Sequence, residues 1–311
     1  MEVEDVASID SKDLGAAHLR NYRNAIAERL QQAQNPVSAA VITHGSDTLS
    51  TTAFYLHSTL PAELLAKKKI VLTASMKPAN VANPDGPQNL RDAFALARSR
   101  QGHGVMVTLA GKIYAPPGFD KKHTTSVKAF QTVNAELVGT VRNGKVSIKN
   151  DPPAPFHTFK VGDAEELPVV TTLHSEPGVN PAFTVAMIQA AVRHGAEGIV
   201  YAGTGNGTIN ETVAEELKRQ AAAGVLVVRS TKVGNGEVIR NGAFQDDRHG
   251  TAASGKLGPD AARLLAQMAI AEARQANPGV PVDMGEIRKV FDPYQSYGAP
   301  QDPGVTGAAA V

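Results

Sequence analysis

The chain has 311 residues, of which 42% are hydrophobic and 20% are charged, and its mean hydropathy is -0.18. These values are typical of a globular protein, and the length allows two domains. The 31 basic and 30 acidic side chains leave a net charge of +1, so the chain has no global field to attract phosphate backbones and nucleic-acid binding is disfavoured. Because the chain has no cysteine, disulfides, thiolate metal ligands and a cysteine nucleophile are excluded as well.

The sequence contains no membrane signal. No apolar run approaches the roughly 20 residues of a membrane-spanning helix, and residues 1–10 are acidic and have no apolar signal-peptide region. We therefore expect no association with a membrane, and the compartment is left open.

The first half of the chain alternates helical and strand patterns. Apolar residues spaced three and four apart predict a helix over residues 14–34, with Asp13 as its N-cap. Similar patterns predict strands over 39–43, 69–74 and 105–109, helices over 52–60 and 89–100, and a hairpin over 139–149. This alternation predicts an α/β domain with a mostly parallel sheet, at residues 1–149.

The second half repeats the alternation after a break. Residues 150–155 contain three prolines and no periodicity, and we place a linker at 150–167. Strands are predicted over 169–173, 198–201 and 226–230, and helices over 182–194, 212–222 and 259–276. The sequence thus predicts a second α/β domain at 168–296 and a disordered tail, rich in Gly, Ala and Pro, at 297–311.

One turn carries most of the chemistry. Residues 41–49 read Val-Ile-Thr-His-Gly-Ser-Asp-Thr-Leu, which leaves a strand, turns at Gly45 and enters a helix. Ligands bind at the carboxyl ends of strands in α/β sheets. Ser46 provides a hydroxyl and Asp47 a carboxylate there, beside the positive end of a helix. On the residues alone, N-capping of that helix explains this pair equally well.

The segment Thr-His-Gly-Ser-Asp-Thr-Leu resembles the second signature of bacterial-type L-asparaginases and glutaminase-asparaginases, with Ser46 where that family has Thr. The resemblance continues in family order through residues 75–78 (Ser-Met-Lys-Pro), 85–90 (Asp-Gly-Pro-Gln-Asn-Leu), 202–207 (Ala-Gly-Thr-Gly-Asn-Gly), 228–230 (Val-Arg-Ser) and 287–291 (Ile-Arg-Lys-Val-Phe). Several unrelated motifs in a fixed order are a specific signal.

The resemblance implies a homotetramer of two-domain α/β subunits, with a larger N-terminal domain and a smaller, flavodoxin-like C-terminal domain. It implies hydrolysis of the side-chain amide of L-asparagine, and often L-glutamine, by a hydroxyl nucleophile without cofactor or metal. L-Asparagine, L-glutamine and L-aspartate are the implied small-molecule ligands, and the implied compartment is the periplasm or the cytoplasm.

The resemblance also assigns residue roles. Ser46 matches the hydroxyl of the family's second catalytic site, and Asp47 the carboxylate that binds the substrate ammonium. Ser11 matches a serine that binds the substrate carboxylate, with Lys12 in place of a Gln or Glu beside it. Asn206 matches an asparagine that reaches the ligand from a neighbouring subunit. Structural roles remain open for Ser11, as a helix cap, and for Asn206, as a turn residue.

Three features depart from the family pattern. No Thr-Gly-Gly-Thr segment occurs, so we expect the first-threonine loop and the first strand to be missing from the N-terminal domain, with two sheet edges left unpaired. Gln131 stands where the family has a catalytic lysine, and an amide cannot act as a base. Lys128 is the nearest substitute, although a solvated surface position suits it better. Phe244 occupies the place of a glutamate that binds the substrate ammonium.

Two functional hypotheses therefore remain. The chain is an L-asparaginase-like amidohydrolase that acts through Ser46 and Asp47, or it is a catalytically impaired homologue that retains an aspartate- or asparagine-binding pocket. His44 is interpreted as a structural neighbour of the turn. The other histidines lack metal-ligand spacing, so no metal site is predicted.

Overall fold

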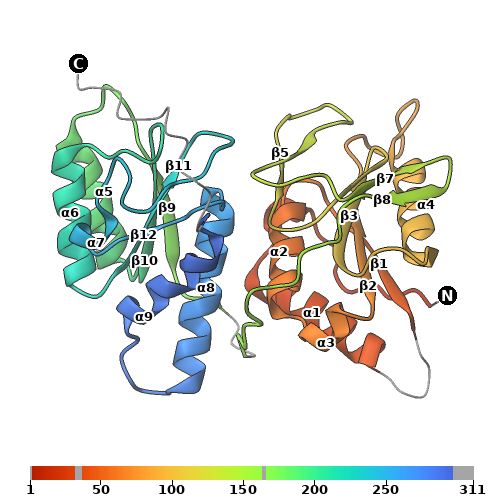
Figure 1. Cartoon of the computed structure of the whole chain (residues 1–311), viewed down its shortest axis with the longest axis horizontal. Helices are drawn as coiled ribbons and strands as arrows, with labels where there is room; N and C mark the ends of the chain where they lie inside the picture. The colour runs from red at the N-terminus through yellow and green to blue at the C-terminus, as the bar shows by residue number, and fades with distance from the viewer. Residues whose placement is uncertain (1, 32–36, 163–165, 297–311) are drawn as a thin grey trace.

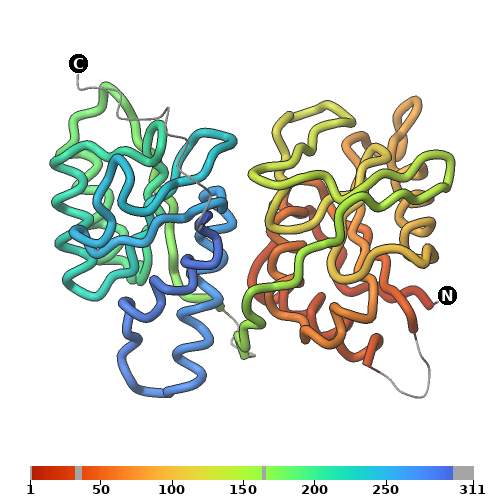
Figure 2. Tube along the Cα trace, in the orientation of Figure 1, coloured from red at the N-terminus to blue at the C-terminus, as the bar shows by residue number. Residues whose placement is uncertain are grey.

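The computed structural model describes residues 2–31, 37–162 and 166–296. They form two α/β lobes that lie side by side, and the chain passes from one lobe to the other once (Figures 1 and 2). The predicted tail at 297–311 lies outside the described residues, as do the last residues of the helix predicted over 14–34. No helix in the described ranges is both long enough and apolar enough to cross a bilayer.

The N-terminal lobe is built on a six-stranded sheet of order β1-β2-β3-β4-β7-β8. The first three strands are parallel and the others pair antiparallel. Short turns connect β3 to β4 and β7 to β8, whereas residues 115–138 connect β4 to β7. The strands are β1 (Ala39–Thr43), β2 (Lys69–Thr73), β3 (Gly104–Leu109), β4 (Lys112–Tyr114), β7 (Gly139–Arg142) and β8 (Lys145–Ile148). The last two are the predicted hairpin.

Two strands that sequence periodicity did not identify form a separate antiparallel ribbon. They are β5 (Phe119–Lys121) and β6 (Phe130–Thr132). Each has only three residues, too few for an alternating pattern to be recognised. This ribbon lies against α2 (Leu49–Thr59) and brings a lysine to the candidate site described below.

Helices cover both faces of the N-terminal sheet. Side chains alternate across a strand, and in β2 Ile70 and Leu72 join the core cluster that contains α1 and α2, whereas Val71 packs with α4 on the other face. The helical elements are η1 (Ser11–Asp13), α1 (Ala16–Gln31), α2, α3 (Ala62–Leu65) and α4 (Gly86–Arg98). The prediction that Asp13 caps the first helix was wrong, because Asp13 ends the short turn η1 and α1 begins only at Ala16.

β1 lies at the edge of this sheet. Among the described residues it pairs only with β2, and residues 39–42 are half-buried whereas β3 is buried throughout. One of the two expected unpaired edges is therefore present at β1. The described residues show no second unpaired edge inside the sheet, because its six strands pair without a gap from β1 to β8.

The C-terminal lobe has a parallel sheet of order β12-β11-β10-β9. Its strands are β9 (Val170–His174), β10 (Gly198–Gly203), β11 (Leu226–Thr231) and β12 (Ala252–Ala253). Its helical elements are α5 (Pro181–Arg193), α6 (Glu211–Ala222), α7 (Asp246–His249), α8 (Pro259–Ala276), α9 (Met284–Arg288) and η2 (Lys289–Tyr294).

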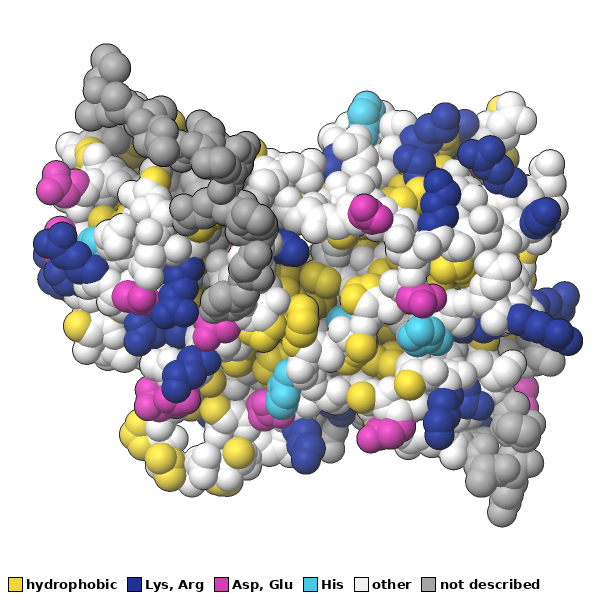
Figure 3. Space-filling model, in the orientation of Figure 1, with side chains coloured by type: hydrophobic (Ala, Val, Ile, Leu, Met, Phe, Trp, Pro, Cys, Tyr) yellow, Lys and Arg dark blue, Asp and Glu magenta, His cyan; other side chains and the backbone are white. Residues whose placement is uncertain are grey.

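The two lobes share one hydrophobic core. Helix α8 covers the face of the C-terminal sheet that points to the other lobe and contacts α2 there (Figure 1). Buried residues of α2, α8 and β10 belong to the same cluster. Hydrophobic side chains are also visible in the hollow between the lobes (Figure 3). The lobes are therefore held by apolar packing in addition to the covalent connection.

Candidate active site

The turn that carries Ser46 begins where β1 ends. Thr43 pairs with Thr73 of β2, and the His44 N–H donates to the Thr73 carbonyl at 2.9 Å, which extends the ladder to the edge of the turn. Helix α2 then begins at Leu49, and its N-cap residue is Thr48. Ser46 and Asp47 thus precede the cap, so the capping explanation does not account for either residue.

Lys121 joins the two predicted site residues. Its Nζ lies 2.9 Å from the Ser46 Oγ and 2.6 Å from Oδ1 of Asp47. The Lys121 side chain is only 19% exposed, whereas that of Asp47 is 58% exposed. A hydroxyl, an amine and a carboxylate therefore form a connected cluster with one open side, as nucleophilic catalysis by an activated hydroxyl requires.

The sequence analysis did not identify Lys121, because the family resemblance places the catalytic amine at residue 131 and Lys128 was considered as its substitute. Gln131 is exposed on β6, opposite Asp120 of β5 in the ribbon, and Lys121 is the next residue along β5, opposite Phe130. Lys128 is exposed, and no hydrogen bond links it to Ser46 in the described part of the chain. Strand pairing places Lys121 opposite Phe130, one position from Gln131 on the partner strand, and strands of three residues give no sequence signal by which this pairing could have been found.

Ser11 holds the turn in place. It is 4% exposed, its Oγ accepts the Asp47 N–H at 3.3 Å, and its carbonyl accepts the Thr48 hydroxyl at 2.9 Å. A Cβ at Gly45 would lie 2.4 Å from the Ser11 Oγ, so only glycine allows this approach. The structure thus gives Ser11 a role in fixing the turn. The Lys12 side chain is 63% exposed and pairs with Asp13.

Both ring nitrogens of His44 form hydrogen bonds next to the turn. Its Nδ1 donates to the Gly45 carbonyl at 2.7 Å, which leaves Nε2 to accept the Thr52 hydroxyl at 3.0 Å. Burial lowers the pKa of the His44 imidazole, although the hydrogen bond to Gly45 acts in the opposite direction. Both ring nitrogens are engaged, which agrees with the interpretation of His44 as a neighbour of the turn.

The end of the adjacent strand β2 is held by Asp85. Its carboxylate accepts the N–H groups of Met76 and Lys77 at 2.9 Å and the Ser75 hydroxyl at 2.7 Å. Burial alone would raise the pKa of Asp85, but these hydrogen bonds outweigh it and lower the pKa. The motifs at 75–78 and 85–90 therefore build the scaffold next to the Ser46 turn.

Asn206 and Phe244 lie in the C-terminal lobe and are both engaged there. The Asn206 side chain donates to the Glu237 carbonyl at 2.8 Å and accepts the Ile239 N–H at 3.1 Å. Phe244 is 8% exposed, and its ring lies 5.3 Å from the guanidinium of Arg229. Within one chain, Asn206 ties a turn and Phe244 fills the core, so their predicted positions at a ligand depend on a second subunit.

A cavity of about 230 Å³ opens beside the Ser46 turn. It is lined by Ala7, Ile9, Ser11, Tyr22, Thr43, His44 and Gly45. The cavity lies between the end of β1 and the residues that precede η1, and it leaves room for a small ligand next to Gly45. The described residues contain no cluster of three or more potential metal ligands there or elsewhere.

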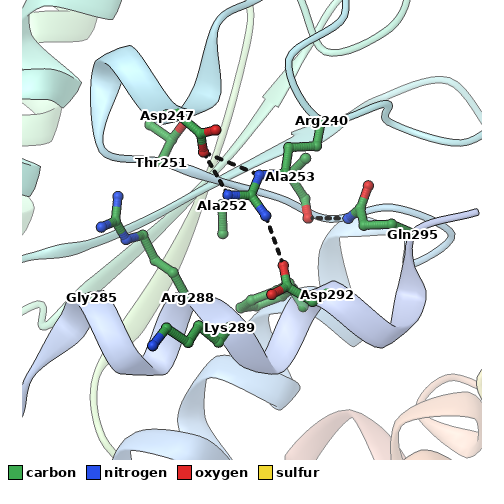
Figure 4. Close-up of a pocket in the computed structure, with 11 residues that line it drawn as sticks. Arg240, Asp247, Thr251, Ala252, Ala253, Gly285, Arg288, Lys289, Asp292 and Gln295 are labelled. Carbon is green, nitrogen blue, oxygen red and sulfur yellow. Dashed lines mark hydrogen bonds and ion pairs between the residues drawn. The ribbon is translucent and has the colours of Figure 1, made fainter. Parts of the chain in front are cut away.

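A second cavity of similar volume lies in the C-terminal lobe (Figure 4). Arg240 reaches across it to Asp247 at 2.7 Å and to Asp292 at 3.1 Å. These ion pairs lie between residues of the cavity wall itself. The ion pairs of Arg240 therefore stabilise the junction between α7, η2 and the loop before α7.

Two family models match this chain, one in each lobe. Residues 1–154 match the family model "Asparaginase, N-terminal", and residues 170–278 match the "Glutaminase/Asparaginase C-terminal domain". "L-asparaginase 2" of Escherichia coli is 30% identical, over 94% of this chain and 79% of that protein. "Glutaminase-asparaginase" of Acinetobacter glutaminasificans is 36% identical, over 83% of this chain and 75% of that protein.

Two further relatives carry compartment names. "Probable L-asparaginase periplasmic" of Haemophilus influenzae is 31% identical, over 88% of this chain and 78% of that protein. The solved structure of a "Probable Cytoplasmic L-asparaginase" from Campylobacter jejuni superposes with a TM-score of 0.80 at 29% identity, over 92% of this chain and 89% of that chain. Similarity therefore extends to proteins named for either compartment.

Proposed function

Because this chain belongs to the asparaginase family, we propose that it hydrolyses the side-chain amide of L-asparagine, and also of L-glutamine, to the acid and ammonia. The observation that carries the proposal is the position of Lys121, whose Nζ contacts both Ser46 and Asp47. It is an amine beside Ser46, which Gln131 cannot provide, so this one of the three departures from the family pattern no longer counts against activity.

In the proposed mechanism Ser46 is the nucleophile. Its Oγ forms a bond to the amide carbon while its proton passes to the Lys121 amine along the 2.9 Å contact. Collapse of the tetrahedral intermediate breaks the carbon–nitrogen bond, and Lys121 returns the proton to the departing ammonia. Water then attacks the ester on Ser46 and releases the carboxylic acid.

Asp47 has two proposed tasks. Its Oδ1 holds the Lys121 amine beside the nucleophile at 2.6 Å, and the exposed remainder of the carboxylate is available to the ammonium group of an amino acid. We propose Ser11 and Lys12 as the side of the site that faces the substrate carboxylate. Asn206 is proposed to act across a subunit boundary in a homotetramer, which we infer from the family resemblance.

A second function is favoured by one observation. Phe244 is buried where the resemblance expects a glutamate, so one carboxylate for the substrate ammonium is missing. A chain that binds L-aspartate or L-asparagine without turnover would show the same geometry. The two functions differ in product release and can be separated directly.

The test is ammonia release from L-asparagine and L-glutamine by the full chain and by Ser46→Ala and Asp47→Ala variants. Ser50→Ala is the matched control, because this hydroxyl lies one turn later in α2 and contacts Asp120 instead of Lys121. We expect both site variants to lose activity and Ser50→Ala to retain it.

Absence of ammonia release from folded protein would overturn the proposed hydrolysis. Calorimetric titration with L-aspartate then decides the second function. Binding that is lost in Asp47→Ala supports a binding protein, whereas no binding to the unmodified chain refutes that function as well.

A further inference from the structure

A buried tyrosine joins the ribbon β5–β6 to the six-stranded sheet. The hydroxyl of Tyr114, in β4, donates to the carbonyl of Phe130, in β6, at 2.8 Å. Both residues are 2% exposed, so this hydrogen bond is shielded from water. Burial raises the pKa of Tyr114 to about 12, and the hydroxyl therefore remains a donor at any pH near neutrality.

The pairing of the ribbon explains why the Phe130 carbonyl is available to Tyr114. The Lys122 N–H donates to the Ala129 carbonyl at 2.8 Å, which makes these two residues a hydrogen-bonded pair. Hydrogen-bonded and non-hydrogen-bonded pairs alternate along an antiparallel ladder. The next pair, Lys121 and Phe130, is therefore non-hydrogen-bonded, and the backbone groups of Phe130 point away from β5. A buried carbonyl in this position needs a donor from another element.

The same pairing places Lys121 on a face with an aromatic base. Side chains of opposed residues lie on one face of a ribbon and are closest in a non-hydrogen-bonded pair, and residues two apart along a strand share a face. Phe130 and Phe119 thus lie on the face of Lys121. Their ring centroids are 6.0 Å apart, and the Phe119 ring stacks on Tyr114 at 5.5 Å. The face that carries the Lys121 side chain is therefore fixed from below by buried rings.

Position matters for Lys121 because its partners belong to other elements. Ser46 and Asp47 lie in the turn between β1 and α2, whereas Lys121 lies on the ribbon. A general base has to lie within hydrogen-bond reach of the proton that it accepts. Any shift of the ribbon against the six-stranded sheet changes the 2.9 Å distance between the Lys121 Nζ and the Ser46 Oγ.

We propose that Tyr114 is a positioning residue for the reaction: through its hydrogen bond to Phe130 it holds the ribbon so that the Lys121 amine lies at Ser46. Tyr114 acts through Phe130 and not on the reacting atoms. The inference rests on the proposed function, because it takes the role of Lys121 from there.

Tyr114→Phe tests the proposal, since it removes the hydroxyl and keeps the ring. We expect kcat to fall about tenfold, because small displacements of a catalytic group are costly. KM should stay within about twofold, because Ser11 binds the Asp47 N–H independently of the ribbon. Tyr201→Phe is the matched control: Tyr201 is also 2% exposed but lies in β10 of the other lobe. Circular dichroism confirms that each variant is folded.

Two measurements separate positioning from a general loss of stability. In a Lys121→Met background, Tyr114→Phe should cause no further loss of kcat, because its effect passes through the amine that is already absent. Reductive methylation, followed by mass spectrometry, measures the amine directly and needs no turnover. We expect labelling of Lys121, relative to the exposed Lys128, to rise at least threefold in Tyr114→Phe.

Several results would overturn the proposal. They are unchanged labelling of Lys121 in Tyr114→Phe, a kcat within twofold of the unmodified chain, an equal loss in Tyr201→Phe, or the same further loss in the Lys121→Met background. If the unmodified chain releases no ammonia, the proposed hydrolysis fails. The labelling ratio then decides by itself whether Tyr114 positions Lys121.

Discussion

Replacement of Lys121 by methionine distinguishes two roles for this residue: a catalytic amine or a partner in a surface ion pair. The substitution keeps most of the aliphatic stem, which is largely buried, and removes the Nζ that contacts Ser46 and Asp47. If Lys121 accepts the Ser46 proton, turnover depends on the lost atom. If Lys121 only pairs with Asp47, the loss affects stability alone.

The two cases differ in magnitude. General acid–base catalysis contributes about 10²–10⁴-fold, which corresponds to about 3–5 kcal/mol in the activation barrier. An ion pair whose carboxylate is 58% exposed is screened by water and contributes less than about 1 kcal/mol to stability. We therefore expect Lys121→Met to lower kcat by at least about a hundredfold, with little change in Tm.

The assay is steady-state ammonia release, with thermal unfolding measured on the same samples. Lys128→Met is the control, because Lys128 is exposed and has no contact with Ser46. Adding Gln131→Lys to Lys121→Met tests the ribbon geometry, since Gln131 lies opposite Asp120 and Asp120 approaches Ser50 of α2. We expect partial recovery of kcat. Retention of kcat within threefold in Lys121→Met, or its loss in Lys128→Met, would refute the assignment.

Two further predictions concern stability. Asp246→Ala should cost about 3–5 kcal/mol of unfolding free energy, because it leaves the fully buried Arg229 unpaired, whereas Asp247→Ala, at an exposed pair with Arg240, should cost less than about 1 kcal/mol. Similar costs in denaturant titrations would contradict this reasoning. Burial lowers the pKa of His57 from 6.5 to about 4. Between these values only the unfolded chain binds the proton, so stability falls by roughly 3 kcal/mol as pH drops from 6.5 to 4. His57→Leu should flatten this pH dependence, and an unchanged slope would disprove it.

Local chemistry made much of the fold predictable. The strand at 39–43 and the helix at 259–276 have the predicted bounds, because long apolar runs and helical periodicity are encoded within each segment. The turn at Gly45 and its position after a strand were predictable for the same reason. The ribbon β5–β6 was not, because three-residue strands carry no periodic signal.

The sequence by itself determined the α/β alternation, the family and the place of Ser46 and Asp47 at the end of a strand. Only the tertiary structure decided that Lys121 contacts Ser46, 75 positions away in the sequence, and that Ser11 binds the Asp47 N–H in the turn. The physical reason is that side chains distant in the sequence meet only through strand register and packing of separate elements. A family pattern that places the amine at residue 131 therefore misses an amine delivered by the paired strand.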